Sequence, residues 1–152
     1  MNSTDIQQFY ARHMQLLDGG AAEAWAGTFT PDAVFAAPSM TEPVRGRDGI
    51  AAGARAAVEG RAAAGETHRH WVTMTTARST GAGIEAVSYV QILATPRGGA
   101  PRVHLSCVMR DRLVRRDGEL LVAERHITRD DRPAGWPRPG FEPLSVASRH
   151  DS

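Results

Sequence analysis

One carboxylate stands in the middle of an otherwise apolar row of a predicted strand. The segment Arg102–Asp131 holds two runs of alternating apolar and polar residues around Asp117-Gly118, a dipeptide typical of a β-hairpin turn. Because strand side chains alternate between two faces, Asp111 shares a face with Val103, Leu105, Cys107, Met109 and Leu113. Burying an ionised carboxylate is costly, so Asp111 must be paired, lie in a solvated cavity, or have a raised pKa.

The register of this hairpin decides which side chains lie beside Asp111. A two-residue turn would place Glu124 opposite Asp111. The same register would place His126 opposite Met109. This arrangement is a carboxylate pair with a nearby imidazole, a setting that raises one carboxyl pKa for acid/base chemistry.

A three-residue loop would instead place Ala123 opposite Asp111, with Arg125 diagonally beside it on the same face. An arginine in that position keeps the carboxylate ionised. We favour this register because Leu121, Ala123 and Ile127 then form an apolar row around Arg125. Asp111 is therefore interpreted both as an ion-pair partner and as a candidate pocket acid or base, two roles that are compatible.

A second candidate is His70, in a predicted strand over Thr67–Arg78. His70 shares its parity with Val72 and Met74, which predicts that it points inward. An imidazole in a pocket is a suitable general acid or base near neutral pH. His68 and His70 also have the spacing of two metal ligands on one strand face, but no further ligand follows at a suitable distance, so no metal site is predicted.

Several polar side chains accompany these candidates on predicted inward faces. Tyr10 and His13 lie on the apolar face of the first predicted helix, and a buried Tyr10 phenol could donate a hydrogen bond to a ligand oxygen. The side chains of Tyr89 and Gln91 end in polar groups and lie on a strand face that is predicted to point inward. Cys107 is interpreted as a small core residue rather than a nucleophile.

The elements that must position these residues follow from periodicity and from turn signals. Helices are predicted from Thr4 to the Gly19-Gly20 stop, over Ala21–Thr28, and from an Asp48 cap to Gly65, with a possible Thr4–Gln7 capping box. Ser39–Gly46 is predicted as a loop. Strands are predicted over Ala33–Ala37, Thr67–Arg78, Ile84–Thr95, Arg102–Arg115 and Glu119–Asp130. This order predicts an α+β fold with three N-terminal helices packed on a strongly curved antiparallel sheet.

Length and composition narrow the class of protein. The 152 residues predict one domain over residues 1–131 and a Pro-rich tail over residues 132–152, in which Trp136 and Phe141 are the residues expected to pack. The net charge of +1 gives no case for nucleic acid or an anionic membrane. One cysteine and the lack of a membrane-spanning run are consistent with a cytoplasmic protein. No phosphate loop or dinucleotide fingerprint is present, which predicts cofactor-free chemistry.

Four segments carry a resemblance to a known family. The first predicted helix ends in D-G-G, and A-W-A-G-T-F-T-P-D-A-V-F follows it. G-R-D-G-I begins the third predicted helix, and D-R-L-V-R-R-D-G-x-L-L-V-x-x-R closes the hairpin. Over roughly Thr4–Asp131, the chain resembles the nuclear transport factor two-like superfamily and, within it, the SnoaL-like polyketide cyclase branch.

This resemblance implies a cone-shaped fold whose pocket lies between the helices and the curved sheet, and a homodimer that forms through the sheet. Tyr10 matches the oxyanion-holding tyrosine of ketosteroid isomerases in the superfamily, and Asp111 falls close to their hydrogen-bond-donating aspartate. Their catalytic base would precede Pro38, where this chain has Ala37, so His70 becomes the first candidate for the base. The predicted substrate-binding residues are Trp25, Phe35, Met74, Tyr89, Gln91, Cys107, Met109, His126 and Ile127.

The function predicted from sequence is that of a cofactor-independent cyclase, isomerase or dehydratase acting on a hydrophobic polyketide-like intermediate of secondary-metabolite or antibiotic biosynthesis. Asp111 and His70 would share the proton transfers, while Tyr10 and Arg125 would stabilise an enolate oxygen. The alternative is a non-catalytic small-molecule-binding protein or an oxygenase accessory subunit. Epoxide hydrolysis is a third option, which needs Glu124 as a second pocket carboxylate beside Asp111.

Overall fold

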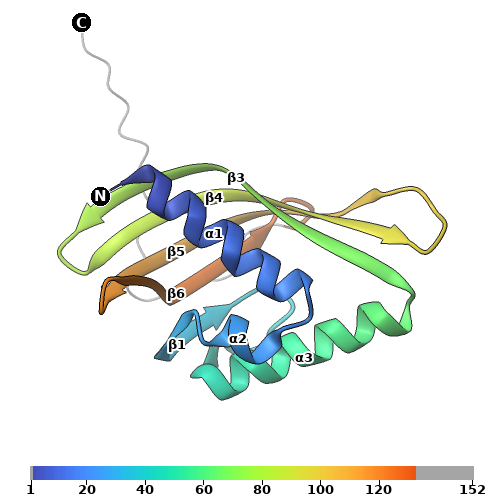
Figure 1. The fold of residues 1–152 in the computed structure, drawn as a ribbon, viewed down its shortest axis with the longest axis horizontal. Coiled ribbons are helices and arrows are strands. Elements are labelled where there is room, and N and C mark those ends of the chain that lie inside the picture. Colours follow the sequence, from blue (N-terminus) through green and yellow to red (C-terminus); the bar gives the residue numbers. More distant parts are fainter. Residues whose placement is uncertain (1, 133–152) are drawn as a thin grey trace, which may run out of the picture.

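The computed structural model describes residues 2–132 as an α+β fold (Figure 1). The predicted tail with Trp136 and Phe141 lies, apart from Arg132, outside the described residues. None of the described helices is long and apolar enough to cross a membrane. The elements in chain order are α1 (Ser3–Asp18), α2 (Ala22–Ala26), β1 (Phe29–Ala36), β2 (Val44–Arg45), α3 (Arg47–Ala63), β3 (Glu66–Thr80), β4 (Gly83–Pro96), β5 (Arg102–Arg116) and β6 (Glu119–Arg129).

The helix ends differ in detail from the predicted ones. The side chain of Asn2, not the predicted Thr4–Gln7 capping box, caps α1 by accepting a hydrogen bond from the Thr4 backbone N–H at 2.9 Å. Gly46 precedes α3 without a side-chain cap, so the Asp48 cap is wrong; Asp48 lies in the first turn, where an acid favours the helix dipole. The predicted loop before α3 contains the short strand β2.

The described strands form one sheet in the order β2-β1-β6-β5-β4-β3. Four of the neighbouring pairs are antiparallel, three of them between predicted strands, but β1 pairs with β6 in parallel. The prediction of a wholly antiparallel sheet is therefore wrong at this pair. It rested on sequential neighbours, whereas β1 and β6 come from opposite ends of the domain and meet only in the folded chain.

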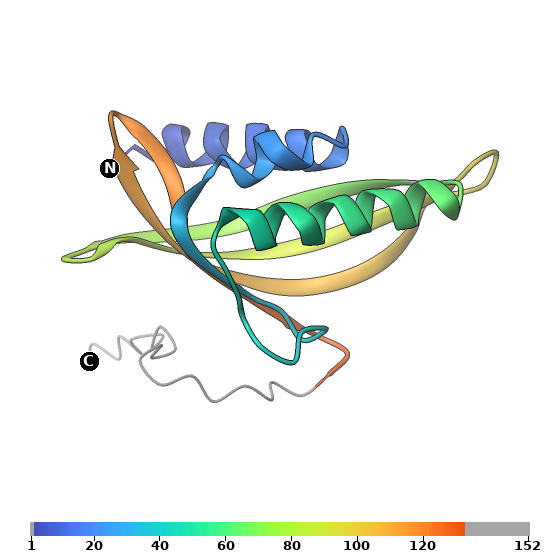
Figure 2. The ribbon, with the colours of Figure 1, turned by 90° about the horizontal axis from the view of Figure 1, so that it is seen from below.

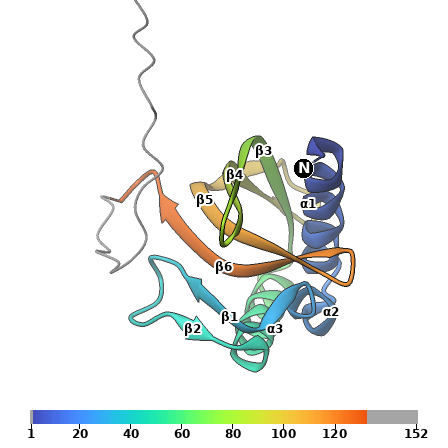
Figure 3. The ribbon, with the colours of Figure 1, turned by 90° about the vertical axis from the view of Figure 1, so that its left-hand side faces the viewer.

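The sheet curves around the two long helices. Figures 2 and 3 show α1 and α3 on the same, concave side of the sheet. Register shifts interrupt the β3–β4, β4–β5 and β5–β6 ladders, and such bulges increase strand bending and twist. The core lies between the helices and the concave face, with Ile6, Phe9, Met14, Trp25, Phe29, Ile50, Val90, Met109, Leu113 and Val122 among its members.

The β5–β6 hairpin has neither of the two predicted uniform registers. Arg116 pairs with Glu119 across the two-residue Asp117-Gly118 turn, so the favoured three-residue loop is wrong. Between Leu113–Val122 and Arg112–Glu124 the register shifts by one, which leaves Ala123 as an extra residue in β6. Beyond this bulge, Arg125 lies directly opposite Asp111. Arg125 is therefore confirmed as the partner of Asp111, although a bulge and not a three-residue loop brings the two residues together.

The turn between β3 and β4 generates a prediction about stability. Gly83 has a φ of +136°, and a Cβ at this position would collide with the carbonyl oxygen of Leu113 in the neighbouring strand. We expect Gly83→Ala to lower the free energy of unfolding by about 2 kcal/mol or more, because backbone strain and a backbone clash act together.

Gly81 of the same turn is the matched control, since a Cβ there meets nothing within 4 Å. Urea unfolding followed by far-ultraviolet circular dichroism measures both variants. Equal stability of Gly83→Ala and Gly81→Ala would contradict the described approach of the two strands.

Candidate functional site

A fully buried ion pair joins β5 to β6. The Arg125 guanidinium donates from Nε to Asp111 Oδ1 at 2.8 Å and from Nη2 to Oδ2 at 2.7 Å. Both residues are only 1% exposed. A bidentate arginine–carboxylate pair is among the stronger hydrogen-bonded arrangements in proteins, and here it satisfies a charge that the apolar row of β5 could not.

Two side chains of α1 extend this ion pair into a buried network. The Tyr10 hydroxyl donates to Asp111 Oδ2 at 2.9 Å, and Arg125 Nη1 lies 2.8 Å from His13 Nε2. Burial, followed by the Asp111 charge, raises the pKa of Tyr10 well above its usual value, so the phenol stays protonated and can donate. The hydrogen bond that Tyr10 was predicted to offer to a ligand therefore goes to Asp111.

His13 is held as a neutral imidazole within this network. Burial and the neighbouring Arg125 charge lower the pKa of His13 well below 6.5. Its Nε2 accepts from the guanidinium, so the proton lies on Nδ1, which is 2.6 Å from Thr28 Oγ1. The Thr28 hydroxyl in turn donates to the Trp25 carbonyl. The network thus fixes the middle of α1 to the sheet.

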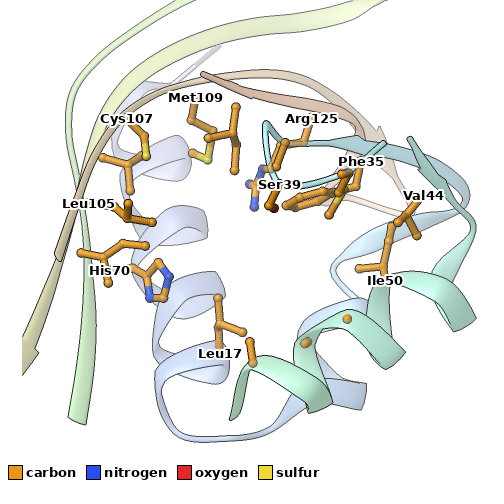
Figure 4. Close-up of a pocket in the computed structure, with 18 of the residues that line it drawn as sticks. Leu17, Phe35, Ser39, Val44, Ile50, His70, Leu105, Cys107, Met109 and Arg125 are labelled. Carbon is orange, nitrogen blue, oxygen red and sulfur yellow. The ribbon is translucent and has the colours of Figure 1, made fainter. Parts of the chain in front are cut away.

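An apolar cavity of about 380 Å³ lies beside this network, between the helices and the concave face of the sheet (Figure 4). This volume is within the usual range for small-molecule sites. Phe35, Ile50, Leu105 and Met109 contribute to its walls, and Figure 4 shows Arg125 and His70 on different parts of the lining. Asp111 and Tyr10 do not line this cavity, and Tyr10 instead lines a second hollow between α1 and β3.

His70 pairs with a carboxylate that the sequence analysis did not select. Asp18 Oδ1 lies 2.6 Å from His70 Nδ1, and Asp18 Oδ2 accepts the His70 backbone N–H at 3.0 Å. The two side chains are 9% and 15% exposed. A carboxylate bound at Nδ1 fixes the imidazole tautomer and leaves Nε2 free to accept a proton. This pair therefore has the arrangement of an oriented general base.

The position of Asp18 follows from the end of α1. Asp18 is the last residue of the helix, where a negative charge opposes the helix dipole. Arg61 of α3 donates to the Leu17 and Asp18 carbonyl oxygens at 2.7 and 3.0 Å, which offsets the negative helix end. An acid in this unfavourable place was the signal in the sequence that could have marked Asp18 as a candidate.

The structure gathers seven of the predicted site residues at the cavity and separates the others from it. The predicted residues that line the cavity are Trp25, Phe35, His70, Cys107, Met109, Arg125 and Ile127. They come from α2 and from four different strands, so no local pattern could have shown that they meet. Burial and a nearby negative charge on Asp130 raise the pKa of Cys107, which agrees with its interpretation as an unreactive thiol.

Met74 does not face the cavity as predicted. Its side chain is 77% exposed, and its φ of +50° lies in the left-handed region. The register of β3 against β4 shifts between Thr73 and Thr76, so β3 carries an extra residue there. The parity that is correct for His70 and Val72 therefore fails at Met74, because a bulge reverses the alternation.

Tyr89, Gln91 and His126 also lie on the wrong face for ligand contact. Tyr89 is 58% exposed and Gln91 is exposed, because Ser88 and Val90 take the inward parity of β4. His126 lies between two cavity-lining residues of β6 and so has the outward parity. These three predictions are wrong because the tertiary packing turns the opposite parity of each strand inward.

The predicted metal-ligand spacing of His68 and His70 does not bring them to a common partner. His68 Nε2 lies 3.1 Å from Glu66 Oε2, and its ring packs near that of His104, whereas His70 binds Asp18. Within residues 2–132 the structure contains no group of three or more His, Cys, Asp or Glu side chains placed to hold a metal ion.

The buried ion pair generates a prediction about stability. We expect Asp111→Ala to lower the free energy of unfolding by about 3–5 kcal/mol, because it leaves the Arg125 charge buried and uncompensated. The double variant Asp111→Leu/Arg125→Met should recover much of this loss, since it removes both charges from the core. Chemical denaturation measures all three proteins. A loss below about 1 kcal/mol in Asp111→Ala would contradict the buried pair.

The comparisons with known proteins agree with this fold. Aln2 from a Streptomyces species superposes with a TM-score of 0.76 at 36% identity, over 84% of this chain and 90% of that one. ActVI-ORFA from Streptomyces coelicolor gives 0.74 at 36% identity, over 84% and 96%. A Catenulispora acidiphila protein solved in complex with S-DNPA gives 0.73 at 37% identity, over 84% and 92%.

A comparison with curated proteins gives no match. The family description that matches is the SnoaL-like domain, over residues 2–126. This range includes α1 to α3, all of β1 to β5 and the part of β6 that carries Arg125. By this match and by the shared structure of its relatives, the chain belongs to the SnoaL-like domain family.

Proposed function

We propose that this protein is a cofactor-independent acid/base enzyme of the cyclase type that acts on a hydrophobic, polyketide-like intermediate. The observation that carries the proposal is that His70 lines an apolar cavity while Asp18 binds its Nδ1. The reaction would begin with removal of a proton next to a carbonyl group, and cyclisation, isomerisation or loss of water would follow. His70 Nε2 would take the proton.

The surroundings of His70 suit this role. The lining of the cavity is mostly apolar, so a bound substrate would displace water from the reacting carbon and its base. His70 also borders a second, more polar hollow of about 360 Å³ between α1 and β3, which Asp18 and Gln15 line as well. We propose that a proton taken up in the cavity leaves through this polar side.

In this proposal, Arg125 supplies the positive charge that faces the carbonyl oxygen of the substrate. Three of its five N–H groups bind Asp111 and His13, which leaves two donors on a guanidinium that borders the cavity. A fixed cation of this kind stabilises a developing enolate oxygen without reorganising. Asp111 would then act as a positioning residue for Arg125. Tyr10 would act indirectly, because its hydrogen bond helps to hold Asp111 in place.

A small-molecule ligand is supported by one relative. The Catenulispora acidiphila protein, 37% identical to this chain, was solved in complex with S-DNPA. We propose S-DNPA and chemically similar compounds as the first ligands to test. The apolar walls formed by Phe35, Leu105 and Met109 favour a hydrophobic ligand over a highly charged one.

One observation favours a second candidate function, that of a non-catalytic binding protein. The Asp111–Arg125 pair is closed and buried, so the Asp111 carboxylate is not available to a ligand, and Glu124 does not line the cavity. Binding without chemistry would then depend on the apolar walls and on the Arg125 guanidinium. The two functions differ in whether His70 transfers a proton, and this difference can be measured.

We further propose that two copies associate through the outer face of the sheet. This face exposes Trp71 at 54%, Tyr89 at 58% and Val103 at 56%, all on the three neighbouring strands β3, β4 and β5. Exposed aromatic side chains grouped on one face are typical of an interface.

Sedimentation velocity should show a dimer that Tyr89→Arg converts to monomer. A monomeric wild type at tens of micromolar would refute this proposal.

The proposed chemistry predicts exchange of the α-hydrogens of a model ketone. We expect the protein to bind 1-tetralone and to accelerate its hydrogen–deuterium exchange in D₂O, as measured by proton NMR. His70→Gln should lower the rate at least tenfold, because it removes the base; Asp18→Asn should also lower it, because the imidazole loses its orienting partner.

His68→Gln is the matched control, since His68 lies on the same strand with the same parity but does not line the cavity. It should exchange the ketone at the wild-type rate. Binding of 1-tetralone without accelerated exchange by the wild type would overturn the enzymatic proposal in favour of the binding protein.

A further inference from the structure

One wall of the cavity contains a glycine that protein packing does not require. Gly53 lies in the interior of α3 and lines the cavity. A Cβ built on Gly53 meets nothing within 4 Å. Glycine in a helix interior costs roughly 1 kcal/mol relative to alanine. The position therefore carries a conformational cost that no neighbouring protein atom explains.

Gly49, one turn earlier on the same face of α3, has a different explanation. A Cβ on Gly49 would lie 2.8 Å from Val44 Cγ1, so the close approach of β2 requires glycine there. The contrast between the two positions is informative. Gly49 makes room for the protein, whereas Gly53 is exposed and has open space at its Cβ position where it borders the cavity.

The shape of the cavity depends on this part of α3. Ala54 and Ala57 line it together with Gly53, so α3 presents no side chain longer than a methyl group over this stretch. Larger side chains of β5, including Leu105 and Met109, form another part of the wall. The space left between a smooth helix face and a sheet suits a flat, extended ring system.

We propose that Gly53 determines specificity by admitting a ligand of three fused rings, where a larger side chain would restrict the cavity to two. This inference rests on the proposed function in so far as the ligand is a flat hydrophobic molecule. Gly53 is a size-determining residue of the wall. It takes no part in proton transfer, which belongs to His70.

The test compares 2-naphthoate with 2-anthroate, two fluorescent carboxylates that differ by one fused ring. We expect Gly53→Leu to weaken binding of 2-anthroate at least tenfold and binding of 2-naphthoate less than threefold. Fluorescence titration of the full chain measures both dissociation constants. Gly53→Ala should give a smaller change in the same direction, because it adds only a methyl group.

Gly60→Leu is the matched control, since Gly60 lies in the same helix, has open space at its Cβ position and does not line the cavity. Both leucine variants should fold and be at least as stable as the wild type, because each replaces a helical glycine. Gly60→Leu should leave both affinities unchanged.

The outcomes separate this inference from the proposed function. If the wild type binds both ligands and Gly53→Leu weakens both equally or neither, the size-determining role is wrong and the proposed cavity ligand stands. If the wild type binds neither ligand, the cavity does not take flat aromatic molecules and both proposals are refuted. A selective loss of 2-anthroate supports the inference.

Discussion

The buried ion pair between Asp111 and Arg125 is the constraint on which the rest of the structure depends. Removing two charges from water costs several kcal/mol each, and only mutual pairing with good hydrogen-bond geometry offsets that cost. The pair requires β5 and β6 to stand in one register beyond the bulge at Ala123. It also holds α1 in place, because Tyr10 and His13 complete the hydrogen bonding of the two charged groups.

This constraint divides the polar groups of the interior into two sets. The network around Asp111 is buried, hydrogen-bonded and suited to holding the fold, and the Arg125 guanidinium is its boundary to the cavity. His70 lines the cavity and keeps one imidazole nitrogen available, while its partner Asp18 lines the polar hollow between α1 and β3. The network around Asp111 fixes the position of Arg125, whereas the Asp18–His70 pair serves proton transfer in the proposed reaction.

The bulges in the sheet decide which side chains reach the cavity. An uninterrupted strand alternates its faces, so one extra residue reverses every assignment beyond it. In β3 this reversal turns Met74 to solvent, and in β6 it brings Arg125 to the inner face. The same irregularities bend the sheet around the helices, and so the curvature of the cavity and the error at Met74 have a common physical origin.

The sequence by itself determined the order of the elements other than β2, the α+β class and the carboxylate in an apolar row that had to find a partner. These follow from local periodicity, turn chemistry and the cost of burying a charge, all of which act over a few residues. The family was indicated by the resemblance of four segments to known proteins. Only the tertiary structure decided the parallel β1–β6 pair, the bulge that aligns Arg125, and the meeting of Asp18 with His70. Those features join residues far apart in the chain, and a local pattern carries no information about them.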